Sequence, residues 1–426
     1  MRLLEKLHHP EKYFVIFFKW GLLGLVVGLL GGLLGAGFHH VLHFVTALRG
    51  NYPWLVLLLP GAGLLSVGIY QLFRLRNNRG TNEIIDAVLN GEQLRPLIAP
   101  AIFLSTALTH LFGGSAGREG AALQLGGSVA SILGRALRLN ENERTVRTMS
   151  GMSAVFAGLF GTPLTATLFT MEFASVGTIF SPALLPCYLA AFTASRASLA
   201  LGVHPEGILL PETVAFTAST NMQVLALALA VGILGIAMCF LLHEAEHLAA
   251  KKLPNQWLRI FLGGCVIAVL TLLVGAHRYN GAGMDMALGA VEGKANWYDF
   301  IMKLLFTAVT LAAGFKGGEI VPTFCIGATF GCTLAGLMGL DPGIGAALGL
   351  IGLFCCVTNS PIAAIILSVE MFGSANLYLF AFVCVIAFVI SGNWGLYASQ
   401  IIQFSKSSTV QSAREPQSTD SQGDKS

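Results

Sequence analysis

Two glutamates in glycine-rich breaks place the strongest constraint on how this chain can fold. Glu119 lies in Gly113-Gly-Ser-Ala-Gly-Arg-Glu-Gly120, and Glu319 lies in Gly314-Phe-Lys-Gly-Gly-Glu-Ile-Val-Pro322. The surrounding sequence is apolar: 54% of the 426 residues are hydrophobic and only 11% are charged, whereas a soluble domain has about 25% charged residues. We therefore expect a polytopic membrane protein, in which a buried carboxylate is costly and marks a candidate functional site.

A second pair of similar segments indicates an internal repeat. Phe160-Gly-Thr-Pro-Leu-Thr-Ala-Thr-Leu-Phe-Thr-Met-Glu172 resembles Thr358-Asn-Ser-Pro-Ile-Ala-Ala-Ile-Ile-Leu-Ser-Val-Glu370, and each follows one of the glutamate breaks. The apolar runs after these glycines and prolines are shorter than the ~20 residues of a membrane-spanning helix. Such short half-helices point to a binding site near the bilayer midplane. The sequence thus predicts an all-α protein of two inverted repeats, with helix N-termini that suit an anion where the repeats meet.

Polar segments set the predicted domain boundaries. Residues 1–19 form a cytoplasmic N-terminal arm, because basic residues favour the cytoplasmic side of a membrane. The transmembrane domain covers residues 20–405, with repeat halves of approximately 20–250 and 257–405 that divide near Gln256. Residues 406–426 are rich in Ser, Thr and Gln and are predicted to be a disordered cytoplasmic tail.

Two patterns within the transmembrane domain predict its helices and their packing. Spanning helices are expected at Trp54–Phe73, Val224–Leu242, Ile260–Val274 and Tyr378–Ile390. Gly24, Gly28 and Gly32 recur at the spacing of one helix face, and such small residues allow close contact between membrane helices.

Composition excludes several classes of function. The net charge of +3 is too small to indicate a nucleic-acid partner, and the sequence has no basic stripe. The eight cysteines all lie in apolar runs and show no Cys-x-x-Cys spacing, so we interpret them as small hydrophobic residues. We therefore expect no bound metal and no cofactor.

Two motifs offer an enzymatic alternative. Gly113-Gly-Ser-Ala-Gly117 matches the Gly-x-Ser-x-Gly elbow of hydrolases, but that motif needs a strand before it and a histidine partner, and here the flanks are apolar and helical. His243-Glu-Ala-Glu-His247 matches the His-Glu-x-x-His zinc motif, so an intramembrane zinc metalloprotease would use His243, Glu244 and His247, with Asp341 as a third ligand. The simpler interpretation is a polar cytoplasmic link, and replacement of His243 by Ala should then leave ion transport nearly intact.

Several motifs together resemble the CLC family of anion channels and transporters. Gly117-Arg-Glu-Gly120 is similar to a signature of that family, and Gly317-Gly-Glu-Ile-Val-Pro322 is similar to its second-half motif. The segments that begin at Pro163 and Pro361 resemble its paired helices, and Tyr397 falls where the family places an anion-contacting tyrosine. The resemblance covers about Trp20 to Gln403 and implies the CLC fold of two inverted repeats with broken half-helices.

Three departures from the chloride-type pattern resemble the fluoride/proton antiporter branch of the family. Gly80-Thr-Asn-Glu-Ile84 replaces the Gly-Ser-Gly-Ile-Pro motif, Glu319 replaces a hydrophobic residue, and Phe173 replaces the inward proton-relay glutamate of chloride/proton exchangers. Val321 stands where that branch is expected to have Thr. The resemblance implies a proton-coupled fluoride exporter in a bacterial inner membrane, working as a homodimer with both termini cytoplasmic. A chloride/proton exchanger or a passive anion channel is the alternative within the family.

The resemblance also implies roles for individual residues. Glu119 would be the gating, proton-carrying carboxylate and Glu319 a central acidic group that couples the two ions. The anion would be bound by Asn82, Tyr397 and the backbone amides of Gly120, Ile320 and Val321. A side-chain amide donates two hydrogen bonds where a hydroxyl donates one, which suits a small and strongly hydrated anion. Structural alternatives are ion pairs of Glu119 with Arg118 and of Glu319 with Lys316, while Glu172 and Glu370 are expected to bond to backbone at the ends of half-helices.

Overall fold

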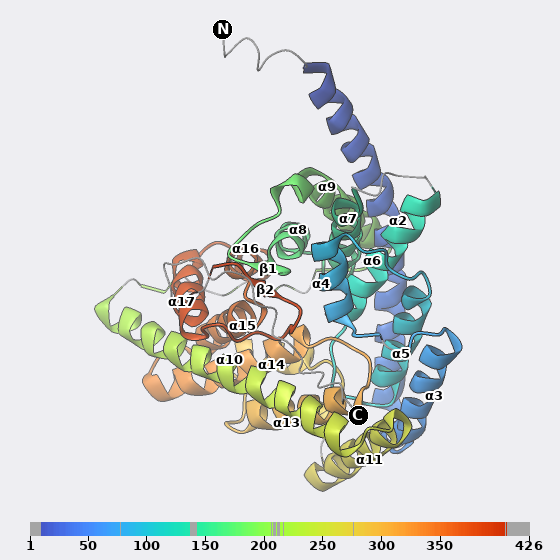
Figure 1. Ribbon diagram of the computed structural model, residues 1–426. Helices are drawn as coiled ribbons and strands as arrows, with labels where there is room; N and C mark the ends of the chain where they lie inside the picture. Colours follow the sequence, from blue (N-terminus) through green and yellow to red (C-terminus); the bar gives the residue numbers. More distant parts are fainter. Residues whose placement is uncertain are drawn as a thin grey trace, which may run out of the picture.

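Helices form most of the computed structural model (Figure 1). The structure describes residues 10–76, 78–136, 143–205, 207, 210, 214–215, 217–275, 277–404 and 406. Residues 1–9 of the predicted arm and 407–426 of the predicted tail lie outside this part of the chain.

The helices fall into two series of similar order. The first contains α2 (Pro10–Asn51), η1 (Pro53–Leu58), α3 (Leu59–Leu72), α4 (Thr81–Asn90), α5 (Ile98–Leu111), α6 (Glu119–Ala136), α7 (Arg144–Phe160), α8 (Pro163–Glu172), η3 (Ser181–Ala183) and α9 (Leu184–Ala200). The second contains α10 (Ala218–Lys252), α11 (Gln256–Val274), η4 (His277–Tyr279), α12 (Met284–Val291), α13 (Asp299–Ala313), α14 (Ile320–Met338), α15 (Pro342–Thr358), α16 (Pro361–Phe372) and α17 (Leu377–Ile390). Strands β1 (Ser175–Val176) and β2 (Ile401–Ile402) pair in parallel, with Ser175 opposite Ile401.

Within the described residues, the α-helices of the two series correspond in order, which confirms the predicted repeat. The first series begins with the long helix α2 and contains α8, a short helix that starts at a proline. The second begins with the long helix α10 and contains α16, which also starts at a proline. The second series begins with α10 at Ala218, and the repeat boundary near Gln256 stays a prediction. The polar run at His243–Lys252 continues α10, and its lysines favour the negative end of that helix.

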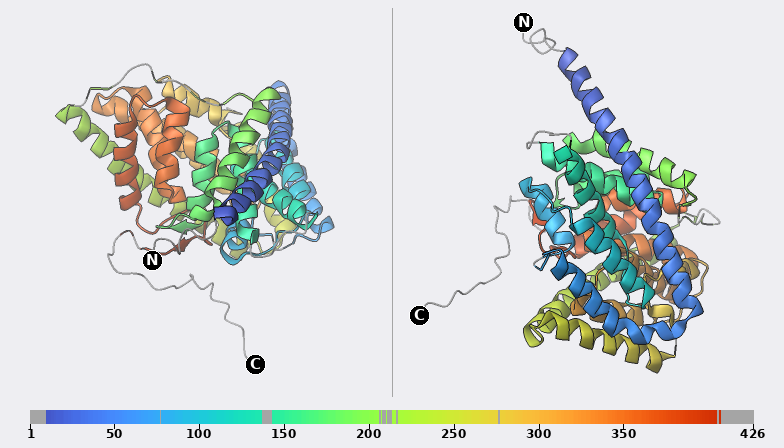
Figure 2. Two further views of the ribbon diagram at one scale, coloured as in Figure 1. Left: turned by 90° about the horizontal axis from the view of Figure 1, so that it is seen from above. Right: turned by 90° about the vertical axis from the view of Figure 1, so that its right-hand side faces the viewer.

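Six helices in the described part of the chain are long and apolar enough to cross a membrane. They cover Phe14–Asn51, Pro53–Leu72, Ser181–Ala200, Ala218–Lys252, Gln256–Val274 and Ile320–Met338. Three of the four predicted spans lie within this set, whereas α17, with 14 residues, is shorter than a full span. Helix α2 passes the predicted arm boundary at residue 19 without a break, and its N-terminal end projects beyond the other helices (Figure 2).

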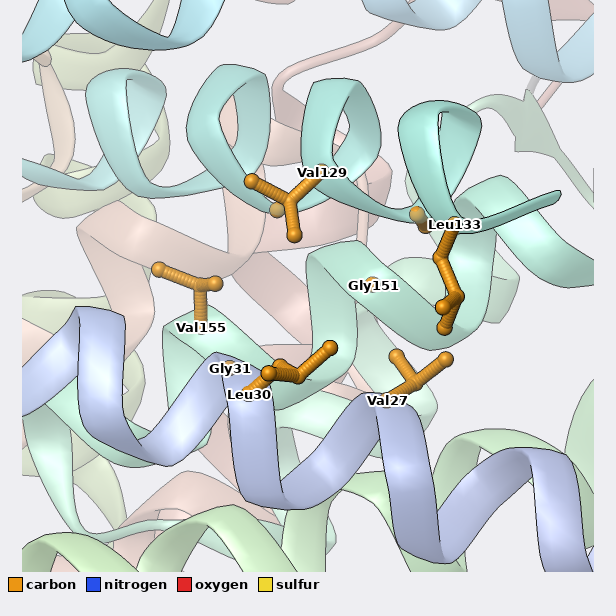
Figure 3. A pocket seen from close by; sticks show the side chains of 9 residues that line it. Val27, Leu30, Gly31, Val129, Leu133, Gly151 and Val155 are labelled. Carbon is orange, nitrogen blue, oxygen red and sulfur yellow. The ribbon is translucent and has the colours of Figure 1, made fainter. Parts of the chain in front are cut away.

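The glycine stripe on α2 packs against α9, as predicted. A Cβ atom added at Gly28 would lie 2.6 Å from Ala190 O, and one added at Gly32 would lie 2.7 Å from Ala194 O. Only glycine permits this approach of the two backbones. A small cavity remains where α2 faces α6 and α7 (Figure 3), lined by Val27, Leu30, Gly31, Gly126, Val129, Ala130, Leu133, Gly151 and Val155. Because its lining is apolar, this cavity is not the site predicted around Glu119 and Glu319.

Candidate functional site

The turns that carry Glu119 and Glu319 meet through a two-bond bridge between the halves. Gly117 N donates to Gly318 O at 2.6 Å, and Gly318 N donates to Gly117 O at 2.8 Å, in an antiparallel bridge. Helix α6 begins at Glu119 and helix α14 begins at Ile320, immediately after the bridge. The first N–H groups of a helix have no partner within that helix. The starts of α6 and α14 therefore both present N–H donors beside the bridge.

The Glu119 carboxylate is enclosed and only partly hydrogen-bonded. The residue has no exposed surface. Its Oε2 accepts from Arg118 N at 3.1 Å, and the Val321 N–H also faces the carboxylate. Its Oε1 is buried and has no partner among the described residues. The Arg118 guanidinium lies 5.0 Å from the centre of the Phe160 ring. The free oxygen leaves Glu119 able to bind a further group.

Glu319 lies at the start of α14, close enough to Glu119 for a direct electrostatic interaction. Its Oε2 is also buried and has no partner within the described residues. Lys316, the alternative ion-pair partner, instead places its ammonium 4.6 Å from the centre of the Tyr70 ring. The site therefore holds two neighbouring carboxylates from different halves, each with an oxygen available to an ion.

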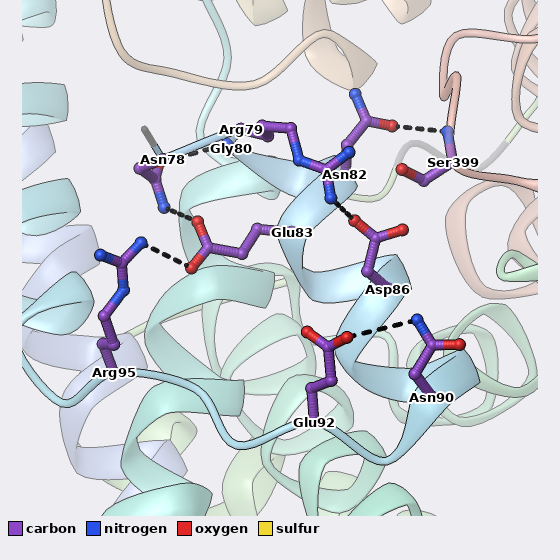
Figure 4. Close-up of polar contacts among 10 residues, drawn as sticks. All are labelled: Asn78, Arg79, Gly80, Asn82, Glu83, Asp86, Asn90, Glu92, Arg95 and Ser399. Carbon is purple, nitrogen blue, oxygen red and sulfur yellow. Dashed lines mark hydrogen bonds and ion pairs between the residues drawn. The ribbon is translucent and has the colours of Figure 1, made fainter. Parts of the chain in front are cut away.

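Tyr397 and Asn82 are the two predicted side-chain ligands of the anion. Tyr397 is 5% exposed, and its hydroxyl is buried without a partner in the described part of the chain. Its phenol is within electrostatic range of both glutamates, and its ring meets that of Phe173 edge to face at 6.0 Å. Asn82 Oδ1 accepts from Ser399 N at 3.0 Å (Figure 4), so its NH₂ group is the end of the amide that can donate to an anion.

The predicted backbone ligands lie at two helix starts. Gly120 is the second residue of α6, and Ile320 and Val321 are the first two residues of α14. The Val321 side chain is buried and adds no hydrogen-bond donor. The structure thus places Glu119, Glu319 and the three backbone ligands at the two helix starts beside the Gly117–Gly318 bridge; the roles of all the predicted site residues in transport remain predictions.

Comparison with known proteins identifies the family. The model of the voltage-gated chloride channel family matches residues 62–392. A chloride/fluoride channel protein of Pseudomonas syringae pv. tomato is 35% identical over 413 residues, covering 95% of this chain and 91% of that protein. The chain belongs to the CLC family. An H⁺/Cl⁻ exchange transporter of Vibrio cholerae is 26% identical over 392 residues, covering 84% of this chain and 82% of that protein.

Solved structures confirm the CLC fold. The crystal structure of a CLC-type fluoride/proton antiporter is similar with a TM-score of 0.87 and 36% identity, over 90% of this chain and 98% of that one. A slow cyanobacterial Cl⁻/H⁺ antiporter is similar in fold with a TM-score of 0.77 and 20% identity, over 87% of this chain and 94% of that one. The predicted all-α fold of inverted repeats with broken half-helices is confirmed.

Two residues of this CLC site were missed by sequence reasoning. Thr81 Oγ1 lies 2.7 Å from where a Cβ atom at Gly120 would stand, so α4 reaches the start of α6. Gln124 Nε2 donates to Gly120 O at 3.1 Å, while its buried Oε1 has no partner in the described chain. Both could have been recognised as site residues from the sequence, because Thr81 directly precedes Asn82 and Gln124 is a lone amide one helical turn beyond Gly120.

The residues needed by the two enzymatic alternatives make other contacts. Ser115 Oγ lies 3.0 Å from Thr307 Oγ1, and the imidazole of His110 bonds to Thr106 O. Asp341 accepts from Ile344 N at 2.8 Å and caps α15, while His243 Nε2 lies 3.1 Å from Leu396 O. Among the described residues, no three His, Cys, Asp or Glu side chains are grouped for a metal. Asp341 is therefore wrong as a third zinc ligand.

Proposed function

We propose that this protein is a fluoride/proton antiporter that exports fluoride from a bacterial cytoplasm and so confers resistance to it. One observation carries the proposal: two neighbouring carboxylates, each with a buried oxygen that has no hydrogen-bond partner in the described chain, lie beside the Tyr397 hydroxyl, which also has none there. Groups that can exchange protons and groups that can bind an anion thus occupy one site. The relatives described as a chloride/fluoride channel protein and a fluoride/proton antiporter support the same function.

Competition for hydrogen-bond donors couples the two ions in this proposal. Ionised Glu119 accepts hydrogen bonds only, so it occupies the helix N-termini that an anion would need. Protonated Glu119 releases those donors and can itself donate to fluoride. The negative charges of Glu319 and of an arriving fluoride both oppose ionisation of Glu119, so anion entry favours proton uptake at this carboxylate.

The preference for fluoride over chloride rests on the donors. The NH₂ group of Asn82, the hydroxyl of Tyr397 and the N–H groups of Gly120, Ile320 and Val321 would replace the hydration shell of a small anion. Glu319 would add a further proton-bearing oxygen at the centre. The apolar ring of Phe173 packs edge to face against Tyr397, and Phe173 stands where chloride/proton exchangers have their proton-relay glutamate.

The remaining features follow from the family and the sequence. In this proposal, the protein is a transporter and not an enzyme, and it needs no cofactor. It acts in the lipid bilayer of the inner membrane as a homodimer with one pathway per subunit. Both termini are cytoplasmic.

Ion efflux from proteoliposomes tests the proposal. Vesicles loaded with fluoride or chloride are placed in a medium at pH 7 or above that lacks the loaded ion. Ion-selective electrodes and a pH electrode record ion efflux and external pH together. We expect fluoride efflux much faster than chloride efflux, with protons moving in the opposite direction. Comparable chloride efflux with proton movement would indicate a chloride/proton exchanger, and efflux without proton movement would indicate a channel. Protein-free vesicles control for passage of HF through the lipid.

A further inference from the structure

Residue His243 of the His-Glu-x-x-His motif makes a contact that neither a zinc site nor a polar linker explains. Its Nε2 lies 3.1 Å from Leu396 O, the carbonyl directly before Tyr397. His243 is half-buried on α10, next to the buried Leu242. His247, one turn further along the same helix, is exposed. The two histidines of the motif therefore have different surroundings.

Tyr397 depends on its backbone for its position. It lies after α17 in a non-helical segment, so no helical hydrogen bonds hold it. Its hydroxyl has no partner in the described chain, so the side chain has no polar anchor. We define residues 396–403 as the strap, because they run from the site to β2.

The strap is tied to both halves of the protein. Leu396 N donates to Val357 O at 2.8 Å on α15, and Ser399 N donates to Asn82 Oδ1 at 3.0 Å on α4. Gln400 Nε2 donates to Thr358 O at 2.8 Å and to Phe173 O at 2.5 Å. Ile401 N and Gln403 N then pair with Ala174 O and Val176 O, both at 3.2 Å. Most of these contacts bind the strap after Tyr397, whereas among the described residues only Val357 and His243 bind it before Tyr397.

The His243 contact fixes the peptide unit that leads into Tyr397. A peptide bond is planar, so holding the Leu396 carbonyl also fixes the direction of the Tyr397 N–Cα bond. Val357 holds the N–H of Leu396, and His243 holds its C=O. Without His243, this carbonyl loses its donor and the peptide plane can rotate.

We propose that His243 is a positioning residue that orients Tyr397 toward the ion site through the Leu396 carbonyl. The proposal rests on the assignment of Tyr397 as an anion ligand in the proposed function. It also changes the expectation for His243→Ala, which should impair anion binding and not leave transport untouched.

Four variants test this role in the full-length protein in proteoliposomes: His243→Ala, His243→Gln, His247→Ala and Tyr397→Phe. Initial fluoride efflux is measured against internal fluoride concentration, giving KM and kcat. We expect His243→Ala to raise the fluoride KM about five- to tenfold, the usual effect of losing one hydrogen bond, with kcat within about twofold. His243→Gln retains an N–H donor and should recover most of the affinity. His247→Ala is the matched control and should behave as the wild type.

A double-mutant cycle separates positioning from general stability. If His243 acts through the Tyr397 hydroxyl, His243→Ala should have little further effect on KM in the Tyr397→Phe background. Additive effects, or a wild-type KM for His243→Ala, would overturn the proposal. Equal loss in the His243 and His247 variants, with inhibition of the wild type by a zinc chelator, would replace it with the zinc interpretation. Wild-type flux decides the proposed function separately: if chloride is carried instead, the same cycle is measured with chloride.

Discussion

Glu172 and Glu370 cap each other's helices: Glu172 lies on α8 and caps α16, and Glu370 lies on α16 and caps α8. The Glu172 carboxylate accepts from Ile362 N at 3.1 Å and Ala363 N at 2.9 Å, at the start of α16. The Glu370 carboxylate accepts from Leu164 N at 2.9 Å and Thr165 N at 2.8 Å, at the start of α8. Each takes up two N–H groups that a helix start leaves unpaired and places a negative charge at a positive dipole end. This confirms the expectation that both bond to backbone.

Replacing either capping glutamate should destabilise the fold. Glu370→Gln leaves one oxygen to accept two N–H donors and removes the charge, at a cost of about 1–3 kcal/mol. We expect a lower thermal midpoint in detergent for Glu370→Gln and for Glu172→Gln. Because both contacts join the same pair of helices, the double variant should lose less than the sum of the single losses. Additive losses would mean that the two caps act independently.

Neutral Glu119 should stop coupled exchange. Glu119→Gln can neither ionise nor carry a proton, so fluoride and proton fluxes should no longer be linked. Combined electrode measurements on proteoliposomes report both fluxes. Glu83→Gln is the control, because the Glu83 carboxylate pairs with Arg95 and accepts a hydrogen bond from Asn78 (Figure 4). Coupled exchange by Glu119→Gln would remove Glu119 from its proposed role.

Glu319 should matter for fluoride itself. Glu319→Ala removes the second carboxylate from the site, and we expect a fluoride efflux rate at least about tenfold lower, equivalent to ~1.4 kcal/mol in barrier height. The same variant should largely keep its thermal stability, since Oε2, one of the two carboxylate oxygens it loses, has no hydrogen-bond partner in the described structure. An unchanged fluoride rate would leave Glu319 a structural role only.

Replacing Gly318 by alanine should push apart the two turns that carry Glu119 and Glu319. Its Cβ would stand 2.4 Å from Glu119 Oε2 and 2.8 Å from Gly120 N, closer than atoms can approach. We expect Gly318→Ala to abolish transport, measured as fluoride efflux from vesicles containing equal amounts of folded protein. Gly37→Ala is the matched control, since a Cβ atom there meets nothing within 4 Å.

Lys406 should make stability depend on pH. It lies beyond α17 and donates to Asn359 Oδ1 at 2.5 Å and Ser391 Oγ at 2.9 Å, facing the Phe388 ring and the thiols of Cys239, Cys355 and Cys356. Burial lowers the pKa of Lys406 from 10.5 to about 8. The unfolded chain therefore binds more protons between pH 8 and 10.5, and stability should rise with pH in that window.

The expected gain from pH 7 to pH 9 is about 1 kcal/mol. It is measured as the difference in thermal midpoint shift between the wild type and Lys406→Met, which lacks the titrating group. Equal pH profiles for the two proteins would show that Lys406 does not titrate in this range.

The fold was largely predictable because its determinants are local. The glycine-rich turns at Glu119 and Glu319 and the prolines at 163 and 361 mark helix starts in the sequence itself, and the structure begins helices there. The continuity of α10 through His243–Lys252 could not be predicted, because a polar run at the end of an apolar helix looks like a linker in the sequence. The contacts of His243 with Leu396 and of Asn82 with Ser399 could not be predicted. Leu396 and Ser399 lie on the strap, far along the chain from their partners, and only the folded arrangement brings each pair together.

The strap has a consequence for how the protein is made. Synthesis runs from the N-terminus, so both carboxylates and all the helices of the two halves are present before Tyr397 and the strap emerge. An unfinished or truncated chain therefore has neither the phenol donor nor the segment that ties α4 to α15. In the proposed function, such a chain therefore forms no complete anion site until the strap has been added.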